Sequence, residues 1–338
     1  MLRIGIDVGG TNTDAVVLDG DVVLEWVKMN NSADITGGVT AALNQLLAKA
    51  HAATDRIGAV MIGTTQFTNA VVQRRDLSPV AAIRLGLPAT QSLPPMVDWP
   101  DDLRAAIGDY WFLAHGGYEF DGRVISPFDA AELRAIAAGI RRRGIDHVAI
   151  SAVFSPINQE MEREAAAIVA SDVPGARITL SEDIGRIGLL ERENAAILNA
   201  CLQQLGGRTI DAFTAALAAA GITAPLFSTQ NDGTLMSADD AKRFPVLTFA
   251  SGPTNSMRGA AFLSGLQEAL VVDIGGTTTD VGALRPSTWA ARPAMPCRRW
   301  TPPSSAARPS RTWSRAPSRW GRRCCAPGAT NRIRSTRS

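Results

Sequence analysis

Two short segments, far apart in the chain, carry the same pattern of carboxylate, glycine and threonine residues. The segment Asp7-Val8-Gly9-Gly10-Thr11-Asn12-Thr13-Asp14 recurs as Asp273-Ile274-Gly275-Gly276-Thr277-Thr278-Thr279-Asp280, with six of eight positions identical. Each copy follows one apolar, strand-like run and precedes another. Because a repeat in a matching context is more informative than one motif, we interpret both copies as functional hairpins rather than plain glycine-rich turns.

The residue types in this pattern suit the phosphates of a nucleotide. Paired glycines let the backbone approach a ligand closely, consecutive N–H groups converge on an anion, and threonine hydroxyls add uncharged donors. No helix follows the glycines directly and the motif has no lysine, which excludes a Rossmann fingerprint and a Walker A loop. A carboxylate at the end of a strand can hold Mg²⁺, usually through water, so we assign Mg²⁺ to Asp7 and Asp273. Phosphate binding is assigned to Gly9, Gly10, Thr11, Asn12, Thr13, Gly275, Gly276, Thr277, Thr278 and Thr279.

Other polar residues follow apolar strands or begin helices. Thr64, Thr65 and Asn69 come after a predicted strand and are candidates for the substrate side of a cleft. Capping of the helix that follows explains them equally well. Ser251 and Gly252 precede a predicted helix, whose free N–H groups would bind an anion; a simple cap is the favoured alternative.

The elements that must position these residues alternate between strand and helix, which indicates an α/β protein with largely parallel sheets. A weak pattern with four prolines predicts a loop-rich insertion at about 85–125. Asp129, with Glu132 three residues later, predicts a capping box. Strands are expected at 3–8, 13–18, 22–29, 59–62, 147–153, 177–180, 226–229, 246–249, 270–272 and 281–284. Helices are expected around 39–47 and at 129–143, 159–170, 190–205, 210–220, 237–240 and 251–263.

Charge and cysteine are divided unevenly along the chain. Residues 286–338 contain no Asp, Glu or Lys and 12 of the 34 basic residues, which leaves a net charge of −10 for the rest. An acidic body gives no reason to expect nucleic-acid binding. We see no signal peptide or membrane span and expect a cytoplasmic protein. Cys201, alone in the body, lies in an apolar helical stretch and is interpreted as part of the core.

The paired Asp-x-Gly-Gly-Thr hairpins resemble the two phosphate loops of the actin/hexokinase/heat-shock-protein ATPase superfamily. Within it, the chain is most similar to the hydantoinase A/5-oxoprolinase family. Four further segments carry this likeness, which covers residues 1 to about 285: Gly63-Thr64-Thr65-Gln66-Phe67-Thr68-Asn69-Ala70, the helix region with Glu193-Asn194 and Leu198-Asn199-Ala200, Asn231–Ser237, and Ser251-Gly252-Pro253 with Gly259-Ala260.

The resemblance implies duplicated actin-like (ribonuclease H-like) ATPase domains, the second one incomplete. An N-terminal domain would span residues 1–180 and the start of a hydantoinase A domain residues 181–285. The implied activity is ATP-dependent, Mg²⁺-dependent opening of a cyclic amide such as a hydantoin, N-methylhydantoin or 5-oxoproline. Implied partners are the small-molecule substrate, a hydantoinase B-type subunit and further copies in an oligomer, without nucleic acid or membrane. An ATP-dependent ketone carboxylase subunit, a small-molecule kinase and an inactive truncated product stay open as alternatives.

Residues 286–338 differ in composition from the rest of the chain. They hold eight of 19 prolines, four of seven tryptophans and three of four cysteines, with no apolar periodicity. We expect this segment to be disordered. A genuine Arg-rich tail is one explanation; we favour a frameshift shortly after Leu284, since a GC-rich gene read out of frame gives this composition. Without the rest of the second domain, the chain is expected to have low stability or weak nucleotide affinity.

We predict that another reading frame of the coding DNA after Leu284 continues the protein. That frame should encode strand-like runs and a glycine-rich segment, as the resemblance implies. Resequencing this region and translating all three frames checks the prediction. If no frame continues in this way, the tail is a real part of the protein and the frameshift hypothesis is wrong.

Overall fold

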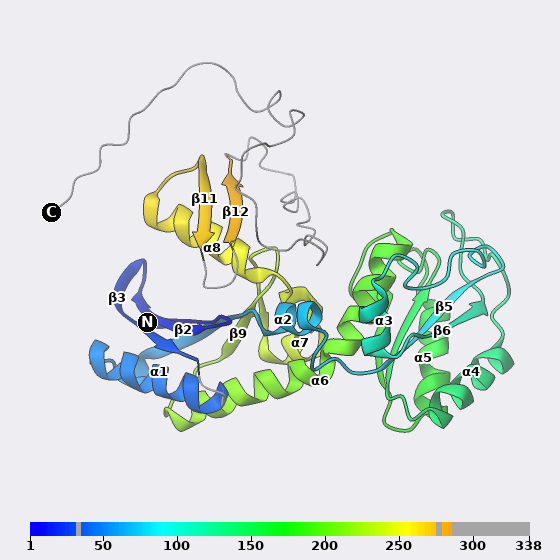
Figure 1. Ribbon diagram of the computed structural model, residues 1–338, viewed down its shortest axis with the longest axis horizontal. Helices are drawn as coiled ribbons and strands as arrows, with labels where there is room; N and C mark the ends of the chain where they lie inside the picture. The colour runs from blue at the N-terminus through cyan, green and yellow to red at the C-terminus, as the bar shows by residue number, and fades with distance from the viewer. Residues whose placement is uncertain (32–34, 275–278, 286–338) are drawn as a thin grey trace, which may run out of the picture. The chain divides into compact units, whose positions relative to one another are not determined.

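A six-stranded mixed sheet carries the first hairpin. In the computed structural model, which describes residues 1–31, 35–274 and 279–285, the predicted meander is confirmed as β1 (Leu2–Val8), β2 (Asn12–Asp19) and β3 (Val22–Asn30). The sheet continues with β4 (Ile57–Thr64) and β9 (Leu226–Thr229), both parallel to β1, and ends at β10 (Leu235–Ser237), in the order β10-β9-β4-β1-β2-β3. Figure 1 labels β2, β3 and β9 of this sheet. The predicted residues Gly275, Gly276, Thr277 and Thr278 and the tail 286–338 lie outside the described residues.

Alternating side chains of these strands explain the position of the core. Leu2, Ile4, Ile6 and Val8 of β1 are all buried, whereas the residues between them are not, as expected for a strand with one buried face. The helix α1 (Ile35–Ala50) packs on β2 and β3 and places Val39, Leu43 and Leu46 in the same core. The 3.6-residue spacing of its apolar residues predicted this buried side.

A second, four-stranded sheet is entirely parallel. Its strands are β5 (Val80–Leu87), β6 (Tyr110–His115), β7 (His147–Ala152) and β8 (Arg177–Leu180), in the order β6-β5-β7-β8. Two helices, α4 (Ala130–Arg142) and α5 (Glu160–Asp172), contribute to its core. The Asp129 cap is confirmed, since its carboxylate accepts from the backbone N–H groups of Ala131 and Glu132.

The predicted loop-rich insertion at 85–125 is wrong in part. It contains the end of β5, the helix α3 (Asp101–Ile107) and β6. A parallel strand buried on both faces shows no polar alternation, and in β5 every residue but the last is buried. All four prolines lie in the connection between β5 and α3. The prediction of a loop is therefore right for this connection and wrong for the strands and the helix around it.

The two helices expected at 190–205 and 210–220 form one continuous helix, α6 (Leu189–Ala219). It passes through Gly206 and Gly207, which the sequence indicated as a break. Gly206 is needed for close packing, because a Cβ there would lie 3.1 Å from the Cβ of Pro245. Favourable packing therefore offsets the low helix propensity of glycine. The same helix supplies Phe213 to the first core and Ile197 to the core beside α2 (Gln66–Gln73) and α3.

The strand expected at 246–249 is also wrong. This segment is a short 3-10 helix, η3 (Pro245–Thr248). Its N–H and hydroxyl groups bond to α6 and to itself, since Val246 N donates to Asn199 Oδ1 at 3.3 Å and Thr248 Oγ1 donates to the Pro245 carbonyl at 2.8 Å. With these local partners the apolar run needs no neighbouring strand.

Four of the remaining elements match a helix or strand expected from the sequence: α7 (Ala238–Arg243), α8 (Ser251–Ser264), β11 (Ala269–Ile274) and β12 (Thr279–Leu284). Ser237 caps the short helix that it was predicted to begin. Cys201 is fully buried, and burial raises the pKa of its thiol to about 12, which confirms a core role. No described helix is long and apolar enough to cross a bilayer. Two short 3-10 helices, η1 (Thr54–Arg56) and η2 (Ser181–Asp183), complete the described elements.

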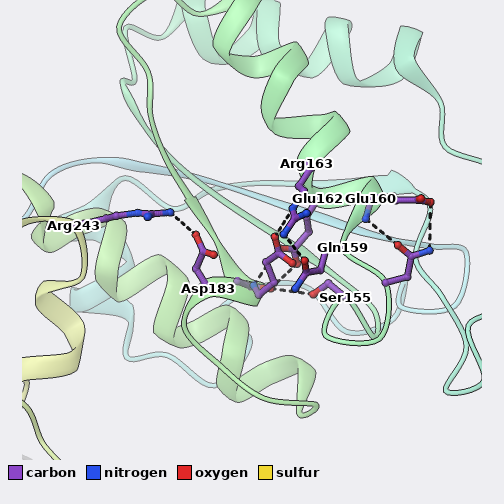
Figure 2. A network of polar contacts seen from close by, with 10 residues as sticks. Ser155, Gln159, Glu160, Glu162, Arg163, Asp183 and Arg243 are labelled. Carbon is purple, nitrogen blue, oxygen red and sulfur yellow. Dashed lines mark hydrogen bonds and ion pairs between the residues drawn. The ribbon is translucent and has the colours of Figure 1, made fainter. Parts of the chain in front are cut away.

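Charged side chains are buried at the carboxyl ends of the second sheet. Figure 2 shows Glu162, whose Oε1 accepts from Ser181 Oγ at 2.6 Å and from the Ala152 backbone at 2.8 Å. The fully buried guanidinium of Arg192 completes this group by donating to Ser181 Oγ at 2.8 Å. Around it lie exposed pairs such as Arg243 with Asp183, at 2.8 Å. Every charge at the centre has a partner, so this network is read as structural.

A buried ion pair joins β5 to α6. Arg84 and Glu193, both almost fully buried, form two parallel hydrogen bonds of 2.5 and 2.7 Å. Ser151 Oγ of β7 donates to the same carboxylate at 2.8 Å. Bidentate hydrogen bonds strengthen such an ion pair. Removing one partner destabilises the fold, because the other charge stays buried without compensation.

We predict that Arg84→Met lowers the free energy of unfolding by about 3–5 kcal/mol, because it leaves the Glu193 carboxylate buried without its cation. Urea denaturation measures the loss. The control Arg123→Met, which breaks an exposed pair with Asp121, should cost less than about 1 kcal/mol. The double variant Arg84→Met/Glu193→Leu should regain much of the stability; equal losses in the single and double variants would contradict the role given to the pair.

Candidate functional site

The two repeated motifs form hairpins with the same register. In the first, Asp7 of β1 lies opposite Asp14 of β2; in the second, Asp273 of β11 lies opposite Asp280 of β12. Thr279 follows the second turn directly and pairs with Ile274, as Thr13 pairs with Val8. The sequence repeat is therefore also a structural repeat, with equivalent carboxylates at equivalent positions.

The first turn is braced from the end of β3. The Asn31 backbone N–H donates to the Thr11 carbonyl at 2.9 Å, and its side-chain Nδ2 donates to the Gly9 carbonyl at 2.8 Å. Thr13 Oγ1 donates to Asn31 Oδ1 at 2.9 Å and is buried. The Thr13 hydroxyl thus supports the turn and does not face a ligand. The residues left accessible at the tip are Gly10, Thr11 and, half-buried, Asn12.

Carboxylates gather around Asp7. The Asp7 side chain is open to solvent on one side, but surrounding protein removes part of its hydration. Together, this burial and, to a lesser extent, the charges of Asp14 and Asp273 raise the pKa of Asp7 to about 6, while Lys28 opposes them. Lys28 lies across from Asp14 on β3 and pairs with it at 3.3 Å. The charge of Asp273 also acts on Asp7, so the second hairpin adds to the negative charge that the first carboxylate experiences.

The second carboxylate is held by the helix that precedes it. Ser256 Oγ of α8 donates to Asp273 Oδ2. Burial and the charge of Asp273 raise the pKa of Asp280. Both hairpins therefore hold a pair of carboxylates whose charges repel, and a bound cation would relieve that repulsion.

The predicted residues after β4 divide between two roles. Thr64 is buried and its Oγ1 accepts from the Gln66 N–H at 3.2 Å, so it caps α2. Thr65 and Asn69 are half-buried, and Asn69 Nδ2 donates to Thr65 Oγ1 at 3.4 Å. A Cβ added to Gly10 would lie 3.7 Å from Asn69 Nδ2. Asn69 and Thr65 thus adjoin the first hairpin, whereas the Thr64 hydroxyl already accepts a hydrogen bond from the start of α2.

The start of α8 lies against α2. The Ala250 N–H donates to Thr68 Oγ1 at 3.2 Å, and a Cβ on Gly252 would lie 4.0 Å from the Thr65 methyl group. Ser251 is buried, and its hydroxyl has no hydrogen-bond partner within the described part of the chain. A buried hydroxyl without a partner is uncommon. Ser251 and Gly252 remain predicted anion contacts, now placed beside Thr65.

Polar side chains from three elements pack closely around Gly63, at the carboxyl end of β4. A Cβ at Gly63 would lie 3.0 Å from Asp7 Oδ1, 3.1 Å from Asn255 Nδ2 and 3.6 Å from Thr229 Oγ1. Asp7 and Thr229 belong to the neighbouring parallel strands β1 and β9, and Asn255 to α8. The carboxyl ends of adjacent parallel strands are the usual position of ligand sites in α/β proteins.

Several of these residues were not identified from the sequence. Asn31 and Thr229 are single polar residues at strand ends, with no motif around them. Asn255 had a usable signal, because it lies four residues after Ser251 on the same helix and so on the same face. Lys28 could be placed beside Asp14 only from the strand register.

The predicted metal ligands suit Mg²⁺ and not a cage of protein ligands. Among the described residues, no group of three or more His, Cys, Asp and Glu side chains converges as a metal site. Mg²⁺ commonly takes one or two carboxylates and keeps water molecules for the other positions. Asp7 and Asp273, near each other and open to solvent, fit that requirement.

We predict that Asp7→Asn stabilises the ligand-free protein. Since the folded-state pKa is raised to about 6 from 3.8, ionisation above that pH costs folding stability, and below pH 3.8 the group is protonated in both states. The gain should be on the order of 1 kcal/mol near neutral pH, because solvent screens the open side of the carboxylate, and should vanish in acid. Urea denaturation across this pH range measures it. A variant that is less stable than the wild type near neutral pH would contradict the prediction.

Comparison with known proteins covers most of the chain. The sequence profile of the hydantoinase/oxoprolinase N-terminal region matches residues 3–173, and the hydantoinase/oxoprolinase profile matches residues 192–297. Caprolactamase subunit alpha of Pseudomonas jessenii is 27% identical over 308 residues, covering 82% of this chain and 43% of that protein. The acetophenone carboxylase gamma subunit of Aromatoleum aromaticum is 25% identical over 312 residues, with 82% and 42% covered.

Two solved structures share the fold. Nucleotide-free acetone carboxylase superimposes with a TM-score of 0.69 at 21% identity, covering 84% of this chain and 44% of that one. The ATP-dependent caprolactamase of Pseudomonas jessenii superimposes with a TM-score of 0.68 at 24% identity, covering 83% and 43%. The chain spans less than half the length of these relatives. The predicted α/β fold is confirmed, and the chain belongs to the hydantoinase/oxoprolinase family.

Proposed function

We propose that the protein is the nucleotide-binding part of an ATP-dependent enzyme that opens a cyclic amide, such as a hydantoin, N-methylhydantoin or 5-oxoproline. One observation carries this proposal. The hairpins have the same register and carry equivalent carboxylates, Asp7 and Asp273, and Asp7 lies beside Gly63 at the carboxyl end of β4. Paired backbone turns with facing carboxylates suit Mg²⁺ and the phosphates of ATP.

The proposed roles follow the placement of the residues. Asp7 and Asp273 would hold Mg²⁺ through water, and the ion would neutralise charge on the phosphates. The backbone at Gly9, Gly10, Thr11 and Asn12 would bind phosphate on one side. The loop Gly275–Thr278, outside the described residues, and Thr279 after it would bind phosphate on the other side. Thr65, Asn69 and the N-terminus of α8 with Ser251 and Gly252 would line the wall between them.

Phosphorylation would activate an otherwise unreactive amide. The amide carbonyl oxygen would bond to the γ-phosphorus as the bond to the leaving ADP breaks, and the ring nitrogen would lose its proton. Water would then add to the activated carbon, and the ring C–N bond would break to leave an amine and an acyl phosphate. A second water would cleave the acyl phosphate to a carboxylate and inorganic phosphate. Positioning and neutralisation of charge supply most of the acceleration of phosphoryl transfer.

A carboxylase is the second candidate. The gamma subunit of an acetophenone carboxylase is nearly as similar to this chain as the caprolactamase subunit. Both reactions would use phosphoryl transfer to oxygen in the same cleft, so the hairpins suit either. Phosphate release from Mg-ATP separates them: a cyclic amide should stimulate it in an amidohydrolase, and a ketone with bicarbonate in a carboxylase.

We also propose partner subunits and a cytoplasmic location. Two of the similar proteins are named as subunits, alpha in one case and gamma in the other. A hydantoinase B-type subunit and an oligomeric assembly would therefore accompany this chain.

We predict that Gly10→Val weakens Mg-ATP binding by about tenfold or more, which corresponds to ~1.4 kcal/mol. Gly10 is exposed at the turn, so the larger side chain should be tolerated by the ligand-free protein but should obstruct a phosphate. Thermal unfolding at millimolar Mg-ATP measures the effect, since a ligand raises the melting temperature of the state that it binds.

Gly207→Ala is the matched control, because a Cβ there meets open space. It should keep the wild-type response to Mg-ATP. A wild-type chain without any response, or a Gly10→Val variant that responds fully, would count against ATP at the hairpins.

A further inference from the structure

A side-chain amide to which no phosphate or metal has been assigned, that of Asn255, lies beside Gly63. Asn255 is half-buried on α8, one helical turn after Ser251. Its Nδ2 lies 3.1 Å from the position of a Cβ on Gly63, and Asp7 Oδ1 lies 3.0 Å from the same point. The Asn255 amide of α8 and the Asp7 carboxylate of β1, which would hold Mg²⁺, therefore both lie beside Gly63.

Thr229 fixes the orientation of this amide. The Thr229 hydroxyl donates its hydrogen to the Ile62 carbonyl at 3.4 Å, which leaves its oxygen as an acceptor. Asn255 Nδ2 donates to that oxygen at 3.0 Å. Since only the nitrogen of the amide can donate, Nδ2 must point to Thr229 and Oδ1 must point away.

The oriented amide keeps unused hydrogen-bonding capacity. One Nδ2 hydrogen is committed to Thr229, while the second hydrogen and Oδ1 have no partner within residues 1–31, 35–274 and 279–285. Asn255 thus offers one donor and one acceptor beside the Asp7 carboxylate. A ligand that fits must present one acceptor and one donor close together.

We propose that Asn255, oriented by Thr229, binds the secondary amide of a cyclic substrate. In a small ring the amide is held cis, so its N–H and C=O lie on one edge, which complements the donor and acceptor of a carboxamide. The second lone pair of the substrate carbonyl stays free to attack phosphorus. This inference rests on the proposed function, because it names the group in that site which recognises the substrate.

The experiment compares pyrrolidinone with N-methylpyrrolidinone, which lacks the N–H. Binding of each to the full chain is measured by saturation-transfer NMR without nucleotide. The wild type should prefer pyrrolidinone by about tenfold, since methylation leaves Asn255 Oδ1 unpaired. Asn255→Ala should reduce the ratio to about one, and Thr229→Val should lower it in part. Asn44→Ala, on the exposed side of α1, should keep the wild-type ratio.

Thermal unfolding of the same samples shows that each variant folds, and its response to Mg-ATP tests the proposed function separately. A response to Mg-ATP without preference between the probes overturns the inference and leaves the proposed function intact. A preference that survives Asn255→Ala, or no binding of either probe by the wild type, also overturns it. A preference that depends on Asn255, in a chain without any response to Mg-ATP, supports amide recognition and contradicts the ATP site.

Discussion

The candidate site depends on the parallel pairing of β1 with β4 and of β4 with β9. This pairing places Asp7 directly beside Gly63 and brings the end of β9 to the same edge. The backbone hydrogen bonds between these three parallel strands fix the register, and so hold the strand ends at Asp7, Gly63 and Thr229 side by side. Because Gly63 has no side chain, the polar atoms of Asp7, Thr229 and Asn255 can surround one small space.

The charge in this space works against folding of the ligand-free chain. Burial and the charges of two other carboxylates raise the pKa of Asp7. The ionised form of Asp7 therefore costs folding free energy. A site that is unfavourable without its ligand is common where function requires concentrated charge. Stability therefore has to come from elsewhere, in the three hydrophobic cores and the buried Arg84–Glu193 ion pair.

Helix α6 connects the regions that provide this stability. It contributes Phe213 to the core of the six-stranded sheet, and its first turns carry Arg192 and Glu193 into the polar networks of the four-stranded sheet. Those networks lie at the carboxyl ends of parallel strands, where a ligand site is also common. Arg84 and Glu193 neutralise each other there, and Glu162 and Arg192 both bond to Ser181, which distinguishes these networks from the carboxylates around Asp7.

The sequence alone determined the repeated hairpins, the meander and the family, because a local motif of eight residues with flanking strands is a short-range feature. It also separated capping from core residues at Asp129 and Cys201. Tertiary structure decided the rest. It showed that the Thr13 and Thr64 hydroxyls form internal hydrogen bonds, that Gly206 of α6 packs closely against Pro245, and that β5 is a buried strand. It also placed Asn255 and Asp7, 248 positions apart in the chain, beside the same residue, Gly63. No periodicity reports such a proximity, because strand register and the packing of α8 on β4 create it.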